Sequence, residues 1–291
     1  MAQCISPFTL KTGVAVPCAK CYECTARRVS GWSFRIMKEL ERSSSAYFIT
    51  LTYDPDHCPV TSSNLMTLNK IDYQVTIREL RRLNPEPLKY YTCGEYGTKS
   101  WRPHYHAIIF NLDLQLLIGK KLANLSTKNP DLYLDGTFPF LSPFWPHGQL
   151  TIGKVSEASV GYTLKYISKP KRVPLHQRDD RIPEFSLMSK KLGSNYLSTE
   201  MREWHESDLL NRCYTPLKDG KKIALPRYYK EKIYSQSDRE LIADKYRMEA
   251  ENNYQKLSDS EKNLQNQNND MIIVRKFKKS QLPDSRLKTV L

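Results

Sequence analysis

The sequence predicts an α+β fold built on a central antiparallel sheet flanked by helices. Residues 46–53 are rich in β-branched and aromatic side chains and are followed by Asp54-Pro55, which is typical of a strand and its end. Two further strand candidates, 88–92 and 104–110, lie on either side of a segment with good turn chemistry. The helix candidates 70–83 and 156–167 alternate with these strands, so most of the pairings are local.

The elements follow one another in a simple order. A cysteine-rich loop precedes a basic helix candidate in which Trp32, Ile36 and Leu40 recur at near-helical spacing. Ser156 has the right residue type and place to cap the helix that ends near Ile167. The remaining predictions are a turn around 94–99, a loop-rich insertion at 111–144, a short strand at 149–153 and a polar helix at 238–264.

These elements predict three zones along the chain. Residues 1–45 form a Cys-rich N-terminal segment with a basic helix packed on the core. Residues 46–172 carry the strongest strand signals and form the core domain. Residues 173–291 form a basic, partly helical C-terminal extension.

Composition narrows the class of protein. The 291 residues include 45 Lys and Arg against 31 Asp and Glu, a formal charge of +14, which favours a polyanionic partner such as nucleic acid. No run approaches the roughly 20 apolar residues of a membrane span, and no secretory signal is visible. The seven cysteines are therefore expected to be reduced thiols or metal ligands, in a soluble protein of the cytoplasm with no membrane partner.

Two histidines in one predicted strand form the first candidate site. His104 and His106 are two residues apart, so their side chains share one face and can converge on one divalent ion. Glu95 lies across the predicted turn and can add a carboxylate from the partner strand. This mixed set of nitrogen and oxygen ligands suits Mg²⁺ or Mn²⁺ and leaves positions for water and a phosphate oxygen. Alternatively, the histidines pack against aromatic side chains and Glu95 is an ordinary surface carboxylate.

The second candidate site is a pair of tyrosines on the helix 156–169. Tyr162 and Tyr166 are four residues apart and share one side of the helix with Lys165 and Lys169. A phenol with a pKa near 10 is a weak nucleophile at neutral pH, and adjacent ammonium groups stabilise the phenolate. A metal pair with candidate tyrosine nucleophiles in a basic chain indicates DNA cleavage through a covalent tyrosine link. Taken alone, the tyrosines can equally be packing residues of an amphipathic helix.

The third candidate site is the cluster Cys18, Cys21 and Cys24, spaced C-x2-C-x2-C, to which Cys4 can add a fourth thiolate. A structural Zn²⁺ site is one interpretation. The spacing also resembles the start of a bacterial iron–sulfur motif, but the Cys-Pro that the motif requires does not follow. Plain reduced thiols are the third interpretation.

Three of these elements occur in one order: the strand 48–53, then Glu95 with His104-Tyr105-His106, then Tyr162 through Lys169. This order resembles the HUH endonucleases that initiate rolling-circle replication. More narrowly, it resembles the replication initiators of small single-stranded DNA phages, the microviruses of the gokushovirus type. The segments 94–97 (Gly-Glu-Tyr-Gly) and 102–106 (Arg-Pro-His-Tyr-His) carry the likeness most closely, and it covers roughly residues 1–172. The long insertion before the tyrosine helix departs from the family pattern and leaves the substrate groove open.

The resemblance implies an RRM-like or ferredoxin-like core of about five antiparallel strands, with the tyrosine helix opposite the histidines. It implies that Glu95, His104 and His106 bind Mg²⁺ or Mn²⁺, that Tyr162 and Tyr166 are nucleophiles and that Lys165 stabilises charge. The implied enzyme is a DNA endonuclease that nicks the viral origin, single-stranded or supercoiled, through a 5′-phosphotyrosine link. It leaves a 3′-hydroxyl for the host polymerase and later rejoins the product. Host polymerase and helicase are the implied partners, in the bacterial cytoplasm.

Two other functions fit the same residues. One is a non-catalytic protein that binds single-stranded nucleic acid, in which the histidines are structural. The other is an HUH transposase or plasmid relaxase, which shares the chemistry but serves a different element. In each case basic side chains would line the DNA path, and the candidates are Arg78, Arg81, Arg82, Lys89, Lys169, Lys171 and Arg172.

Overall fold

The computed structural model describes residues 4, 7–11, 13, 15–118, 140–168, 173–217, 220–267 and 271. Its residues divide into two compact units, Arg28–Tyr196 and Met1–Arg27 with Leu197–Leu291, each of which is described by itself. The first contains the predicted core 46–172 and parts of the sequence on both sides of it. In the described part of the chain, no helix combines the length and the apolar character needed to cross a membrane.

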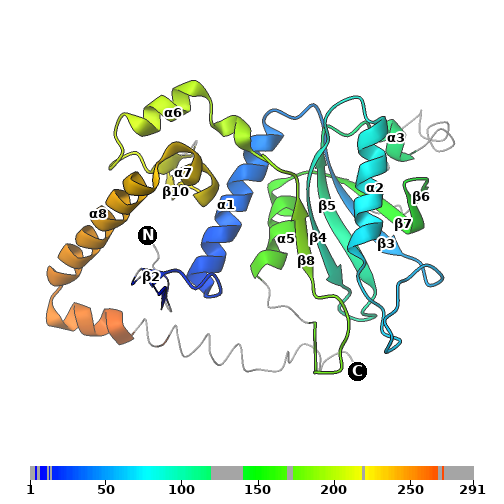
Figure 1. Ribbon diagram of the computed structural model, residues 1–291, viewed down its shortest axis with the longest axis horizontal. Helices are drawn as coiled ribbons and strands as arrows, with labels where there is room; N and C mark the ends of the chain where they lie inside the picture. Colours follow the sequence, from blue (N-terminus) through cyan, green and yellow to red (C-terminus); the bar gives the residue numbers. More distant parts are fainter. Residues whose placement is uncertain are drawn as a thin grey trace. The chain divides into compact units, whose positions relative to one another are not determined.

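A six-stranded antiparallel sheet forms the centre of the unit Arg28–Tyr196 (Figure 1). Its strand order is β6-β7-β3-β5-β4-β8, and the outermost strand β6 is only three residues long. The predicted α+β class with a central antiparallel sheet is thus confirmed. The strands are β3 (Ala46–Tyr53), β4 (Lys89–Tyr96), β5 (Pro103–Phe110), β6 (Phe140–Ser142), β7 (Trp145–Lys154) and β8 (Phe185–Met188).

Strand β4 is longer than the sequence predicts. The sequence places Gly94 in a turn, but the structure keeps it in the strand, paired with Tyr105 of β5. A Cβ atom at Gly94 would lie 3.1 Å from side-chain atoms of both Leu68 and Phe185, so glycine serves close packing here instead of a turn. The predicted turn begins only at Gly97, whose N–H donates to the carbonyl of Arg102.

Helices cover both faces of the sheet, because side chains alternate between the faces along each strand (Figure 1). On one face Tyr105 and Ile109 of β5 pack with Tyr73, Ile77 and other residues of α2 (Lys70–Leu83). The opposite face carries the other set of β5 side chains. There Ile108 and Phe110 pack with Ile36 of α1 (Tyr22–Leu40) and with Val160 and Leu164 of α5 (Glu157–Ser168).

The tyrosine helix α5 begins where the sequence predicts. The Ser156 hydroxyl accepts a hydrogen bond from the backbone N–H of Ser159 at 3.2 Å, which caps the helix. Val160, Thr163 and Leu164 are fully buried, so the helix is held on the sheet by one side. In the predicted insertion 111–144 the structure describes α3 (Leu114–Ile118) and β6; residues 119–139 lie outside the described part.

The other unit is made of short elements and one long polar helix. The described elements are the hairpin β1–β2 (Phe8–Thr9, Ala15–Val16), α6 (Thr199–Glu206), the hairpin β9–β10 (Tyr214–Pro216, Lys222–Ala224), α7 (Arg227–Ile233) and α8 (Gln236–Gln255). Helix α8 confirms the predicted polar helix and starts with a capping box between Ser235 and Asp238. A short 3₁₀ turn, η2 (Ser194–Tyr196), ends the first unit.

Candidate active site

Strand pairing brings the three predicted metal ligands together. Glu95 of β4 lies directly opposite His104 of β5, and His106 is the next residue along on the same face. One carboxylate oxygen, Glu95 Oε1, lies 2.9 Å from His104 Nε2 and 3.0 Å from His106 Nε2. The three donor atoms are within 4.8 Å of one another. They face the side of the sheet that α5 covers.

A second set of contacts orients both imidazole rings. His104 Nδ1 lies 3.1 Å from the carbonyl oxygen of Arg102, and a carbonyl can only accept, so Nδ1 carries the proton. His106 Nδ1 lies 2.9 Å from the hydroxyl of Thr50, the residue opposite it on β3. Each ring therefore turns its Nε2 atom toward Glu95, an arrangement typical of histidine ligands that are held by outer partners.

The charge pattern of this site calls for a cation. Because Nδ1 of His104 carries the proton, Nε2 of a neutral ring presents a lone pair to the Glu95 carboxylate, and two acceptors then face each other at 2.9 Å. Glu95 is only 6% exposed, and a buried carboxylate needs a compensating positive charge. A proton on the imidazole or a metal ion between the donors would each supply that charge.

The distances fit a divalent ion well. Adjacent ligands of an octahedral ion at about 2.1 Å are about 3.0 Å apart. The two distances from Glu95 Oε1 to the imidazoles, 2.9 and 3.0 Å, match that separation. The donor set of two imidazoles and one carboxylate has the mixed character that Mn²⁺ and Mg²⁺ accept, and it leaves coordination positions open.

Tyr162 of α5 lies beside this site. Its ring meets the His106 ring edge to face, with the centroids 5.1 Å apart, and Phe48 stacks on the same His106 ring at 5.6 Å. Tyr162 is still 44% exposed, so its phenol remains open to a substrate. The predicted nucleophile and the predicted metal ligands are thus neighbours in space, although 56 residues separate Tyr162 from His106 in the sequence.

The other predicted residues of α5 are only partly described. The backbone of Tyr166 and Lys165 continues the helix, but their side chains lie outside the described residues. Tyr166 follows Tyr162 by four positions, which places both on one side of an α-helix. The positions of their phenol and ammonium groups stay predictions.

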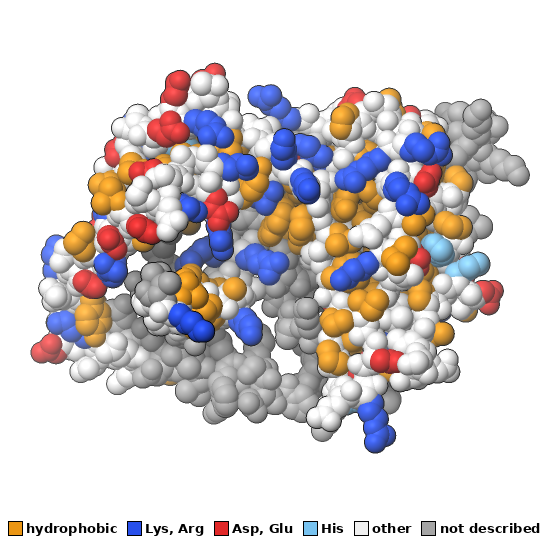
Figure 2. Space-filling view, viewed as in Figure 1, with side chains coloured by type: hydrophobic (Ala, Val, Ile, Leu, Met, Phe, Trp, Pro, Cys, Tyr) orange, Lys and Arg blue, Asp and Glu red, His pale blue; other side chains and the backbone are white. Residues whose placement is uncertain are grey.

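The basic residues of α2 do not line this site. Arg78, Arg81 and Arg82 belong to the helix on the opposite face of the sheet, and Figure 2 shows Lys and Arg side chains gathered over α2. Lys89 is also engaged elsewhere, in an ion pair with Glu39 at 2.7 Å. The expectation that these four residues flank the cleavage site is therefore wrong, because the helical spacing of α2 does not reveal which face of the sheet it covers. Residues 169, 171 and 172 lie outside the described part.

Sequence reasoning missed two residues that shape the site, Thr50 and Phe48. Both lie on β3, which the sequence identifies as a strand but not as the neighbour of the histidine strand. Their alternation with buried Ile49 and Leu51 is visible in the sequence. The pairing partner that gives this alternation its meaning is not.

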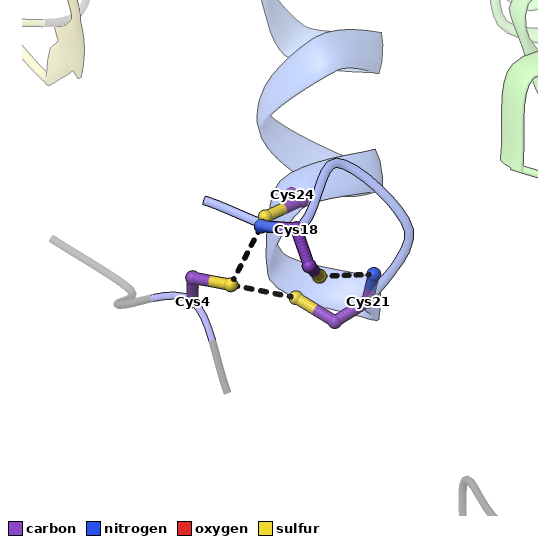
Figure 3. Close-up of side chains that lie close together, drawn as sticks. All are labelled: Cys4, Cys18, Cys21 and Cys24. Atoms are coloured by element: carbon purple, nitrogen blue, oxygen red, sulfur yellow. Dashed lines mark hydrogen bonds between the residues drawn. The ribbon is translucent and has the colours of Figure 1, made fainter. Parts of the chain in front are cut away.

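The four predicted cysteine ligands also come together, in the other unit. Cys4, Cys18, Cys21 and Cys24 place their sulfur atoms within 4.8 Å of one another (Figure 3). The Cys4 and Cys21 sulfurs are 3.8 Å apart, and the N–H of Cys18 donates to the Cys4 sulfur at 3.2 Å. Burial, together with hydrogen bonds to Cys21 and Cys4, raises the pKa of the Cys24 thiol to about 12.

Comparison with known proteins agrees with the motif-based resemblance. The family described as replication-associated protein ORF2 matches residues 46–171. Replication-associated protein ORF2 of Spiroplasma virus 4 is 29% identical over 237 residues, 79% of this chain and 71% of that protein. Replication-associated protein VP4 of Bdellovibrio phage phiMH2K is 29% identical over 226 residues, 75% of this chain and 67% of that protein. Replication-associated protein ORF4 of Chlamydia phage 1 is 24% identical over 231 residues, 74% of this chain and 53% of that protein.

No solved structure is significantly similar to this chain. The matched segment contains the strand pair that carries Glu95, His104 and His106, and it also contains α5 with Tyr162. The resemblance to replication initiators of small phages, drawn from these motifs, is therefore confirmed. Through the segment 46–171, the chain belongs to the replication-associated protein ORF2 family.

Proposed function

We propose that this protein is the endonuclease that starts rolling-circle replication by nicking the origin strand through a tyrosine. The proposal rests on one observation above all. Three metal-type donor atoms converge within 4.8 Å on the sheet face where α5 presents Tyr162, whose ring is 5.1 Å from that of His106.

Glu95, His104 and His106 would hold a divalent ion, Mg²⁺ or Mn²⁺. When bound, that ion withdraws electron density from the scissile phosphate and neutralises the charge that builds there. Arg102 and Thr50 keep the two Nε2 atoms aimed at the ion through their contacts with Nδ1. Phe48 and Tyr162 pack on the His106 ring and restrict its rotation.

The reaction is a transesterification. The phenolic oxygen of Tyr162 attacks the phosphorus and loses its proton to solvent, to which the side chain is 44% exposed. The bond from phosphorus to the 3′-oxygen breaks, and that oxygen leaves as a 3′-hydroxyl after taking up a proton. The number of phosphodiester bonds is unchanged, so the 5′-phosphotyrosine link keeps the energy needed for rejoining and no nucleotide cofactor is required.

Tyr166, one helical turn after Tyr162, would act in the second half of the cycle. It cleaves the regenerated junction after one round of synthesis, and the freed 3′-hydroxyl attacks the first phosphotyrosine and closes a circle. Lys165 would stabilise charge on the phenolate or the phosphate. The 3′-hydroxyl left by the first cut would prime the host polymerase, with a host helicase separating the strands in the bacterial cytoplasm.

The direct test is covalent capture of DNA. The purified chain is incubated with Mn²⁺ and a single-stranded oligonucleotide tiling the origin of its phage, and the adduct is digested and located by mass spectrometry. We expect an adduct on Tyr162 or Tyr166, lost when both are changed to Phe and absent without a divalent ion. Tyr254→Phe is the matched control, because Tyr254 is a comparably exposed helical tyrosine, at 39%, outside the site.

The same assay separates the alternatives. Tight binding of the oligonucleotide without any adduct would contradict the proposal and would support a non-catalytic single-strand binder. An adduct that survives the double Tyr→Phe change would show that a different residue is the nucleophile. An adduct formed with transposon ends or plasmid transfer origins, and not with phage origins, would indicate a transposase or relaxase.

A further inference from the structure

The cysteine cluster is a built arrangement that the nicking reaction does not use. All four cysteines are free of disulfide bonds, and they come from three separate places: residue 4, the segment 18–21 and the first turn of α1. The hairpin β1–β2 folds the chain back between Cys4 and Cys18. Figure 3 shows the four sulfur atoms turned toward a common centre at the start of the helix.

We propose that Cys4, Cys18, Cys21 and Cys24 form a structural site for one Zn²⁺ ion. In a tetrahedral site with Zn–S bonds of about 2.3 Å, neighbouring sulfurs are about 3.8 Å apart. The distance between the Cys4 and Cys21 sulfurs is 3.8 Å, and all four sulfurs lie within 4.8 Å of one another. Four thiolates complete the coordination of zinc and leave no open position, which is typical of a structural and not a catalytic site.

Backbone groups of the same segment would stabilise the negative charge of such a site. The N–H groups of Cys18 and Cys21 donate to the sulfurs of Cys4 and Cys18, each at 3.2 Å, and the N–H of Lys20 also points at the Cys18 sulfur, at 3.5 Å. Cys21 immediately precedes α1 and Cys24 lies in its first turn, where the helix dipole favours thiolates.

The local fold has little else to hold it together. None of the described residues between 4 and 21 is buried, and the two strands of the hairpin are only two residues each. Phe8 and Leu10, two large apolar side chains of this stretch, are 53% and 43% exposed. A segment without a core of its own needs a metal or another cross-link to stay folded, and zinc binding supplies folding free energy directly.

Neither an iron–sulfur cluster nor a pair of disulfides fits as well. In a cluster with several irons, the cysteines bind different metal atoms and their sulfurs stand farther apart than around a single ion. A sulfur separation of 3.8 Å is nearly twice the length of a disulfide bond, which is about 2.0 Å. The separation that fits one tetrahedral ion is the one observed.

The test measures zinc in the full-length protein, because zinc can also enter the site at Glu95, His104 and His106. Elemental analysis is therefore made on the His104→Ala, His106→Ala variant, with and without Cys21→Ser. We expect one zinc per chain in the first and none in the second, with Cys58→Ser as a control that keeps it; Cys58 is a half-buried cysteine of the other unit. Replacing zinc by Co²⁺ should give the strong near-ultraviolet charge transfer of thiolate ligands.

A second measurement avoids variants that fail to fold. Chelation of the wild-type protein should speed tryptic cleavage after Lys11 and Lys20, both exposed in the hairpin segment, on the order of tenfold or more, and added Zn²⁺ should reverse this. The inference is overturned by a reduced, folded chain that contains no zinc in the histidine variant, by iron with acid-labile sulfide, or by disulfides among these cysteines. It does not depend on the nicking activity, so either proposal can fail alone.

Discussion

The hydroxyl of Thr50 offers a sharp test of how the metal ligands are held. Thr50 lies opposite His106 in the sheet, and its Oγ1 is 2.9 Å from His106 Nδ1, the ring nitrogen that does not face Glu95. Thr50→Val removes this contact and keeps a β-branched side chain of the same shape in the strand. The perturbation is therefore confined to the orientation and basicity of one ligand.

The expected magnitude follows from that one contact. A hydrogen bond of this kind contributes about 1 kcal/mol, and outer partners of metal ligands typically change metal affinity by roughly 10- to 100-fold. Since 1.4 kcal/mol corresponds to a factor of about ten, we expect the half-saturating Mn²⁺ concentration to rise about tenfold. The rate at saturating Mn²⁺ should change little, because the nucleophile and the ligand atoms remain.

The assay is single-turnover formation of the protein–DNA adduct across a Mn²⁺ titration. Thr52→Val is the matched control: Thr52 lies opposite His104 on the same half-buried face, and within the described part of the chain its hydroxyl has no hydrogen-bond partner. Its titration curve should coincide with that of the wild type. An unchanged curve for Thr50→Val, or an equal shift in both variants, would refute the idea that Thr50 positions His106.

Three further predictions test stability and binding. Asp179→Asn should lower the free energy of unfolding by about 3–5 kcal/mol in chemical denaturation, because it leaves the buried Arg181 guanidinium, now bound at 2.8 Å, without its counter-charge. Arg181 also holds the pKa of the Asp179 carboxyl well below its usual range, so this stability is present above about pH 4 and is lost on further acidification; a variant as stable as the wild type at pH 7 would contradict the assignment. Burial lowers the pKa of His205, so protonation opposes folding and stability should fall as pH drops below about 6.5; His205→Asn, which keeps a donor for the Arg212 carbonyl, should show a smaller fall in melting temperature between pH 7 and 5. Finally, the charge of +14 predicts that affinity for a non-origin oligonucleotide falls steeply and linearly on a log–log salt plot, and a flat plot in fluorescence anisotropy would exclude phosphate contacts as the main source of binding.

The candidate site also shows why a short motif is informative here. The spacing of His104 and His106 matters only in a strand, where alternate residues share a face, and Glu95 matters only if the turn between the strands sets the register that pairs it with His104. The structure satisfies both conditions. The remaining condition, a nucleophile within reach, depends on α5 packing through Val160 and Leu164 against the same sheet face.

Local chemistry in the sequence was enough to identify the donor residues, the main strands, the capped helix at Ser156 and the α+β class. These features depend on alternation, helical spacing and cap preference, which act over a few residues. The sequence predicts the end of β4 too early because Gly94 has the character of a turn residue, whereas only the neighbouring Leu68 and Phe185 reveal its packing role.

Tertiary structure alone decided which segments are neighbours. It placed β3, and with it Thr50 and Phe48, beside the histidine strand, and it put the arginines of α2 on the face away from the site. It also brought Cys4 to the three later cysteines. The physical reason is the same in each case: strand order, helix side and chain reversal are set by burial of apolar surface over the whole unit, and no window of the sequence contains that information.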